Sequence, residues 1–167
     1  MTTEVKSALD ALEEAKCLEQ EGQDFYHQAA LKSASEKSKE TFQSLAKEEA
    51  MHLRLIQRQI DSLASTGQWI HLSETEGETC DLSESIYPQG REGLEKAVPS
   101  DTSETEALLL ALDFENKGYD MYRRAAKETS DPLAREMYEF LATQERLHFD
   151  LLMTNYESMV ALGGWAD

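Results

Sequence analysis

Two kinds of side chain that bind metal ions recur at matched positions in the two halves of the sequence. In each half, a glutamate is followed at the third position by a histidine. Each half also carries, 30 residues earlier, one glutamate, Glu19 or Glu115, that has no such partner nearby, and we call these two the lone glutamates. Carboxylate oxygens and imidazole nitrogens are ligands that divalent first-row metals accept. We therefore predict a site for two metal ions with six ligands: Glu19, Glu49, His52, Glu115, Glu145 and His148.

The two sets of ligands belong to a repeat with a constant offset of 96 residues. Residues 18–30 read LEQEGQDFYHQAA, and residues 114–126 read FENKGYDMYRRAA. Residues 42–55 align with residues 138–151 at the same offset and without a gap. Because two separated blocks share one offset, the halves are interpreted as copies of one structural unit.

The first unit is predicted to form a hairpin of two helices. Apolar residues spaced by three and four indicate a helix over residues 4–31. After a short break, Ser35 is a suitable N-cap for a second helix that ends near residue 65. Because the connection is short, the two helices are expected to pack antiparallel.

The second unit carries equally clear helix-start signals. Asp131 followed by Pro132 marks the start of its last helix, since aspartate caps helices and proline is favoured at the first helical position. Ser103 and Glu106 fit a capping box for the preceding helix. The competing caps for that helix are Asp101 and Thr102. The second unit is therefore also predicted to be a helical hairpin.

The hairpins are separated by 37 residues, 66–102, which contain several glycines and prolines. A loop of this length is unusual in a compact domain, but a crossover along a bundle explains it. Helices of roughly 28 residues span about 42 Å. Residues 91–97 are a candidate short helix within the crossover. The sequence predicts one all-α domain, residues 1–167: a four-helix bundle whose crossover joins helices 2 and 3, between antiparallel hairpins at about 4–65 and 103–160.

The candidate ligands are expected to point into the core of this bundle. Positions three apart share one face of a helix, so Glu49 and His52 point the same way. Their neighbours on that face are apolar: Leu45, Ala46 and Ile56. All four glutamates lie about 21–24 Å from their hairpin bends, so an inverted second hairpin brings them to one level. A buried charge costs several kcal/mol, and no Lys or Arg occupies the inward positions to pair with the carboxylates. We therefore expect bound cations to neutralise the carboxylates.

Two pairs of repeated residues could support the site, each in more than one way. Tyr26 and Tyr122 follow the lone glutamates by two helical turns, and they either hydrogen-bond a ligand carboxylate or pack as ordinary rings. Gly22 and Gly118 lie one turn after the same glutamates. They leave room either for oxygen, peroxide or a bridging carboxylate, or for close helix packing.

Glu48 is a second candidate carboxylate beside Glu49. It stands four residues before His52, which is also a spacing that metal sites use. Its repeat partner is Gln144, which carries no carboxylate, whereas the repeat partner of Glu49 is a glutamate. Glu49 is therefore preferred as the ligand.

This pattern resembles the rubrerythrin branch of the ferritin-like di-iron carboxylate superfamily. The likeness covers both hairpins and rests on Glu19 with Phe25-Tyr26, Leu45-Ala46 before Glu49-x-x-His52, Glu115 with Tyr122, and Glu145-x-x-His148. The resemblance implies a ferritin-like four-helix bundle that binds two irons and forms at least a dimer. It also implies one of two activities. The first is reduction of hydrogen peroxide, and the second is oxidation of ferrous iron together with its storage.

The chain departs from the rubrerythrin pattern at two points. Rubrerythrins typically carry a rubredoxin domain with four cysteines that delivers electrons, whereas this chain has only Cys17 and Cys80. They also carry an extra glutamate one turn after the third-helix ligand, where this chain has Gly118. The remaining six-ligand set is closer to that of bacterioferritin. The resemblance thus implies that any electrons for peroxide come from a separate donor protein.

Bulk composition excludes several classes of function. The 167 residues, with 40% hydrophobic and 29% charged side chains, are typical of a soluble globular protein. A net charge of −17 argues against nucleic acids and anionic membranes as partners. Neither a signal peptide nor an apolar run of roughly 20 residues is visible, so we expect a cytoplasmic protein.

Three functions are compatible with these features. The first is an oxidoreductase that reduces hydrogen peroxide or oxygen with electrons from a separate donor. The second is a ferroxidase or an iron-storage protein, and the third is a non-enzymatic, metal-stabilised interaction or sensor protein. Two iron ions are the expected cofactors, with manganese and zinc as alternatives, since all three accept carboxylate and imidazole. We expect a homodimer or larger homo-oligomer and no catalytic residue beyond the metal ligands.

Overall fold

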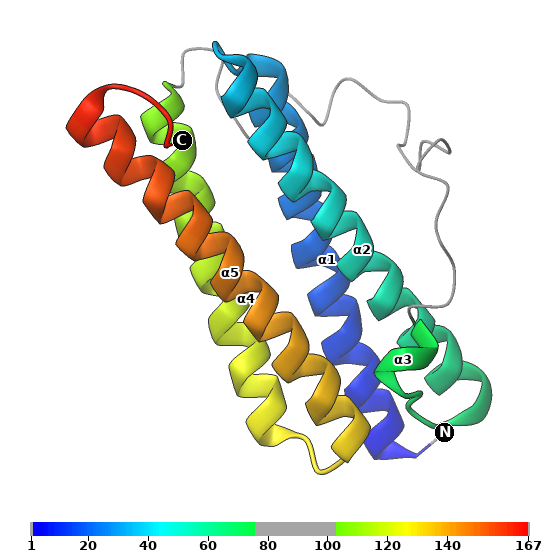
Figure 1. Ribbon diagram of the computed structural model, residues 1–167. Helices are drawn as coiled ribbons and strands as arrows, with labels where there is room; N and C mark the ends of the chain where they lie inside the picture. The colour runs from blue at the N-terminus through cyan, green and yellow to red at the C-terminus, as the bar shows by residue number, and fades with distance from the viewer. Residues whose placement is uncertain (1, 76–102, 167) are drawn as a thin grey trace.

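The computed structural model of the chain describes residues 2–75 and 103–166. Over those residues the protein is all-α, and four long helices form a bundle (Figure 1), which confirms the predicted fold class. The helices are α1 (Thr3–Lys32), α2 (Glu36–Thr66), α3 (Leu72–Thr75), α4 (Glu104–Glu128) and α5 (Pro132–Leu162). The candidate helix at residues 91–97 and Cys80 lie outside the described residues.

The second hairpin is inverted relative to the first. Helices α1 and α2 meet at residues 33–35, at the upper end of the bundle in Figure 1, whereas α4 and α5 meet at residues 129–131, at the lower end. Helix α4 therefore runs parallel to α2 and antiparallel to α1. The closest backbone approaches lie within each hairpin, and α1 with α4 makes the main approach between the hairpins. The inversion brings the middles of the four helices to one level.

Side-chain caps begin three of the long helices at the residues that the sequence predicted. The hydroxyl of Ser35 accepts a hydrogen bond from the backbone N–H of Ser38 at the start of α2. Ser103 and Glu106 form the reciprocal capping box of α4. The carboxylate of Asp131 accepts from two backbone N–H groups in the first turn of α5. Each cap satisfies donors that a helix N-terminus leaves unpaired.

Two apolar clusters fill the bundle on either side of a polar layer. The cluster toward the lower end in Figure 1 includes Leu12, Ala15, Ile56, Leu63, Met137 and Leu141. The cluster toward the upper end includes Phe42, Leu45, Ala111, Leu108, Leu112 and Leu152. On every long helix the candidate ligands fall between these two clusters in sequence. Apolar packing therefore closes the polar layer from both ends.

The chain after α2 folds back over the lower cluster, which the sequence did not predict. The side-chain amide of Gln59 donates to the carbonyl oxygen of Ile70 at 2.9 Å and accepts from its N–H at 3.1 Å. The ring of Trp69 meets the ring of Tyr138 edge-on, with centroids 6.0 Å apart. The first residues of the crossover thus help to cover the lower end of the core.

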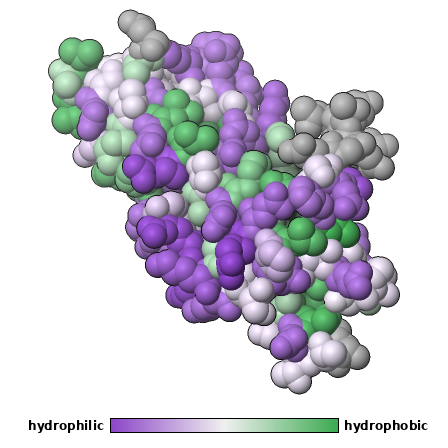
Figure 2. All heavy atoms as spheres, turned by 60° about the horizontal axis from the view of Figure 1, so that its bottom comes forward, coloured by the Kyte–Doolittle hydropathy of each residue, from purple (hydrophilic) through white to green (hydrophobic). Residues whose placement is uncertain are grey.

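The surface is mainly polar. In Figure 2 hydrophilic side chains cover much of the visible face, and the apolar side chains form separate patches. None of the helices described is long and apolar enough to cross a lipid bilayer. Charged groups are thus mostly at the surface, which makes the acids in the polar layer exceptional.

The cap at Asp131 provides a test of how α5 begins. We expect Asp131→Ala to lower the free energy of unfolding by about 1 kcal/mol, because two N–H groups lose their acceptor. Urea denaturation of the metal-free protein measures the change. Asp10→Ala, at an exposed position inside α1, is the control and should leave stability unchanged or slightly raised. Equal losses in both variants would contradict the capping role.

Candidate metal centre

A cluster of four carboxylates and two imidazoles lies in the middle of the bundle. All four long helices contribute, and no member is more than 4% exposed. The members are Glu19 in α1, Glu49 and His52 in α2, Glu115 in α4, and Glu145 and His148 in α5. Among the described residues no lysine or arginine is buried. The structure thus brings together all six predicted residues, and their role as metal ligands stays a prediction.

The imidazole of His52 faces three carboxylates. Its Nδ1 atom lies 3.1 Å from Glu19, 3.3 Å from Glu49 and 3.4 Å from Glu145. The ring lies nearly parallel to that of His148, with centroids 5.6 Å apart and planes 17° from parallel. Because Nδ1 is turned toward the carboxylates, it is the atom of this ring placed to bind a cation.

The imidazole of His148 repeats this arrangement and adds an outward contact. Its Nδ1 lies 3.1 Å from Glu49 and 3.4 Å from Glu115. Its Nε2 lies 2.6 Å from Oε2 of Glu48. A carboxylate behind the ring holds the hydrogen on Nε2 and leaves Nδ1 available as a ligand. Glu48 therefore orients a candidate ligand, a role that its spacing to His52 did not indicate.

The two halves of the cluster differ at this contact. The repeat partner of Glu48 is Gln144, and within the described chain no hydrogen bond or ion pair joins Gln144 to His52. A carboxylate acceptor thus stands behind only one of the two rings. Glu48 was not preferred as a ligand because its repeat position holds Gln144. The same difference leaves only one of the two imidazoles with a carboxylate behind it.

The six residues form two overlapping groups of four. In each group, one ligand atom per residue lies within 4.8 Å of the others. The groups are Glu19, Glu49, His52 and Glu145, and Glu49, Glu115, Glu145 and His148. Glu49 and Glu145 belong to both groups, whereas each lone glutamate and each histidine belongs to one. Two ions held in these groups would share the carboxylates of Glu49 and Glu145.

Two buried tyrosines link the cluster across the hairpins. The hydroxyl of Tyr26 in α1 donates to Oε1 of Glu115 in α4. The hydroxyl of Tyr122 in α4 donates to Oε1 of Glu19 in α1. Both alternatives for these rings occur together, since each hydroxyl donates a hydrogen bond while its ring packs in one of the apolar clusters. Each lone glutamate is therefore oriented by the opposite half of the repeat.

The two repeated glycines make room for different groups. A Cβ atom at Gly118 would clash with Oε2 of Glu145, so this glycine leaves space for the carboxylate. A Cβ atom at Gly22 would lie 2.7 Å from Cε1 of Phe114, so this glycine serves close packing of α1 on α4. The bridging-carboxylate alternative thus fits Gly118 and the packing alternative fits Gly22.

The carboxyl groups of the cluster titrate unequally. Burial raises the pKa of Glu19 to about 8, although the neighbouring His52 acts in the opposite direction. Burial also raises the pKa of Glu145 well above its usual value. Burial acts the same way on Glu49, but the carboxyl group of Glu19 and both imidazoles, which lie beside it, hold the pKa of Glu49 below its usual value. Of these three carboxyl groups, Glu49 is therefore the one that its neighbours hold in the charged form.

The imidazoles are made more basic by the carboxylates around them. Burial by itself lowers the pKa of His52, but the carboxylate of Glu19 and the other acids that face the ring raise the pKa well above its usual value. Burial likewise opposes protonation of His148, yet the neighbouring carboxylates of Glu115 and Glu48 help to raise its pKa to about 12. Protons or other cations must therefore balance the acids of this layer.

Several polar atoms of the cluster have no hydrogen-bond partner within the described chain. They are both carboxylate oxygens of Glu49, Oε2 of Glu115, Oε1 of Glu145 and Nδ1 of His148. Buried polar atoms are normally paired, because leaving one unpaired costs about 1–3 kcal/mol. Carboxylate oxygens and imidazole nitrogens are also ligands for divalent first-row metals. The residues present thus fit a bound metal ion.

The comparison with protein families agrees with this geometry. A family model described as a ferritin-like domain matches residues 7–156. The chain belongs to the ferritin-like domain family. No curated protein and no solved structure matches the chain. The ferritin-like domain spans both hairpins, so all six clustered residues lie within it.

The outward contact of His148 generates a prediction about metal affinity in this ferritin-like protein. Replacing Glu48 with the residue of the other repeat, Glu48→Gln, should weaken the binding of one cobalt ion by about 10–100-fold, as the loss of a ligand's supporting partner does elsewhere. Chelator competition followed by cobalt absorbance measures this effect. Gln144→Ala is the matched control and should leave both affinities unchanged. An unaltered affinity in Glu48→Gln would rule out the orienting role.

Metal binding should also release protons. A ligand must be deprotonated to bind, whereas Glu19 with a pKa of about 8 and His148 with a pKa of about 12 keep their protons at pH 7 without metal. Zinc affinity should therefore rise with pH between pH 6 and 8, by about tenfold per pH unit for each proton released. Calorimetry in buffers of different ionisation enthalpy counts the protons. Binding that is independent of pH and of buffer would contradict the assignment.

Proposed function

We propose that the chain is a di-iron carboxylate redox protein of the rubrerythrin type, which reduces hydrogen peroxide or oxygen with electrons from a separate donor. The observation that carries this proposal is the pair of four-residue groups that share Glu49 and Glu145 in a layer closed to water. Iron bound there would supply the electrons that peroxide or oxygen accepts.

The contribution of the protein is position and exclusion of water. Tyr26 and Tyr122 hold the lone glutamates through hydrogen bonds, so these carboxylates stay aimed at the layer. The apolar clusters above and below keep bulk water away, which strengthens every charge interaction inside. Glu48 is partly exposed and holds the hydrogen on Nε2 of His148, so it links the buried layer to solvent protons.

Electrons must come from outside the chain in this proposal. A rubredoxin-type centre needs four cysteine ligands, whereas the sequence contains two cysteines. Of these, Cys17 is an exposed, free thiol on α1. Reduction of hydrogen peroxide to two waters consumes two electrons and two protons. A separate one-electron donor would therefore act twice in each turnover.

Ferroxidase activity is the second candidate, favoured by the acidic surface. The net charge of −17 attracts cations such as ferrous iron toward the bundle. In that case iron is the substrate and is retained as ferric mineral. Light scattering and iron analysis after repeated ferrous additions distinguish the two candidates. Retention of many irons per chain in a large assembly supports storage, whereas a small oligomer that keeps only its resident ions supports the redox proposal.

The redox proposal is tested by rapid mixing. Protein loaded anaerobically with ferrous iron is mixed with hydrogen peroxide or with oxygenated buffer, and absorbance of ferric iron is followed. We expect oxidation by peroxide at one peroxide per two irons. Glu19→Gln should slow it about tenfold or more, because it removes a candidate ligand. Glu21→Gln, on the same helix but exposed, is the control. A ferrous centre that reacts with neither oxidant contradicts the proposal.

A further inference from the structure

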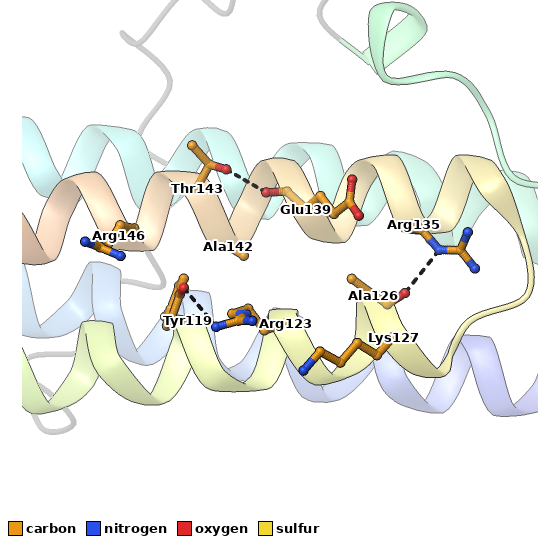
Figure 3. Close-up of a pocket in the computed structure, with 9 residues that line it drawn as sticks. All are labelled: Tyr119, Arg123, Ala126, Lys127, Arg135, Glu139, Ala142, Thr143 and Arg146. Atoms are coloured by element: carbon orange, nitrogen blue, oxygen red, sulfur yellow. Dashed lines mark hydrogen bonds between the residues drawn. The ribbon is translucent and has the colours of Figure 1, made fainter.

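A groove between α4 and α5 gathers positive charge on this acidic protein. It encloses about 700 Å³ and is lined by Arg123 and Lys127 from α4 and by Arg135 and Arg146 from α5 (Figure 3). The acid among its lining residues is Glu139, whose carboxylate is directed away from α4 in Figure 3. The chain has 33 acidic and 16 basic residues, so a groove with four cations and one acid inverts the overall balance.

The arginines of this groove are held in place by local contacts. Arg123 donates to the hydroxyl of Tyr119 at 3.2 Å, and its guanidinium carbon lies 5.4 Å from the ring centroid. Arg135 donates to two carbonyl oxygens at the end of α4, at 3.3 and 2.9 Å. Arg146 lies 3.4 Å from Asp150. A guanidinium has five N–H donors, so each of the three retains donors for an anionic partner.

The cations are too widely spaced for one small anion. Arg135 and Arg146 are eleven residues apart on the same helix, which corresponds to about 16 Å along its axis. All four cations are exposed, and the floor between them is formed by Tyr119, Ala126 and Ala142. A row of separated positive charges over a partly apolar floor matches an acidic protein surface better than it matches a single phosphate group.

The groove lies directly outside the candidate metal centre. Arg146 is the residue after Glu145, and Ala142 precedes Glu145 by one helical turn. On the other wall, Tyr119 follows Gly118, which lies against the carboxylate of Glu145. A protein docked in the groove is thus separated from Glu145 only by the helices that form the groove.

We propose that this groove is the docking site for an acidic one-electron carrier protein that reduces the metal centre. This inference rests on the proposed function. A basic carrier would be attracted to much of the surface of a protein with net charge −17, whereas an acidic carrier is attracted only where positive charge gathers. Two reduced carriers, binding in turn, each lose one electron, and those two electrons with two protons convert one hydrogen peroxide to two waters.

Binding of a defined acidic carrier tests the docking site. The probe is a [2Fe–2S] ferredoxin, titrated into the metal-loaded full chain by calorimetry at low and at physiological salt. We expect binding at low salt that weakens as salt is added, and a loss of about tenfold or more in affinity in the double variant Arg123→Glu/Lys127→Glu. The matched control is Lys6→Glu/Lys47→Glu, which makes the same change in net charge at exposed positions of the first hairpin and should keep most of the affinity.

Each result of this experiment bears on the groove separately from the peroxide chemistry. Equal weakening in both double variants would overturn the inference, as would no ferredoxin binding at low salt. Tighter binding of inorganic tripolyphosphate than of ferredoxin, abolished by the groove variant, would also overturn it in favour of a small-anion site. Basic cytochrome c serves as the opposite probe, and its binding should not weaken in the groove variant. Peroxide inertness with intact, groove-dependent ferredoxin binding would instead sink the proposed function alone.

Discussion

Four carboxylates share a layer of the core that water does not reach, and their charge has to be balanced inside that layer. Two imidazoles supply part of the balance, since each Nδ1 lies among the carboxylates. Protons supply another part, because burial raises the pKa of Glu19 and Glu145. The unpaired oxygens of Glu49 show that hydrogen bonds do not complete it. The layer therefore favours the binding of cations, because the apolar clusters keep out the water that would otherwise solvate the carboxylates.

The two repeats of the bundle differ at residues that lie beside this layer, so its pseudo-twofold symmetry is not exact there. Glu48 stands behind one imidazole, and Gln144 takes its place in the other repeat without a contact to the ring in the described chain. Gly118 admits a carboxylate, whereas Gly22 admits a phenyl ring. An acceptor behind an imidazole increases its strength as a ligand. Two ions in this centre would therefore have unequal environments, although the sequence repeat by itself suggests equal ones.

Periodicity and repetition were sufficient to predict the four long helices, the N-caps of three of them and the six clustered residues, but not the short helix α3. Helix positions follow from local signals such as Asp131-Pro132, and the cluster follows because a repeat marks residues that face the same axis. The fold-back at Ile70 was not predictable in this way, since it depends on one long-range amide pair with Gln59. The same limit applied to Glu48, whose contact joins residues 100 positions apart that no repeat relates. The basic groove was missed because its cations come from two helices and share no sequence spacing.

The tyrosine contacts have a consequence for how such a chain can arise. Tyr26 reaches from the first hairpin to the second, and Tyr122 makes the reciprocal reach back. Each hairpin therefore supplies one tyrosine that donates to the other hairpin and one glutamate that accepts from it. The surfaces through which the two hairpins meet are thus self-complementary. Surfaces of this kind are those that pair identical subunits about a twofold axis. One ancestral hairpin, associating with a second copy of itself, could have assembled the whole layer before gene duplication joined the two copies into one chain.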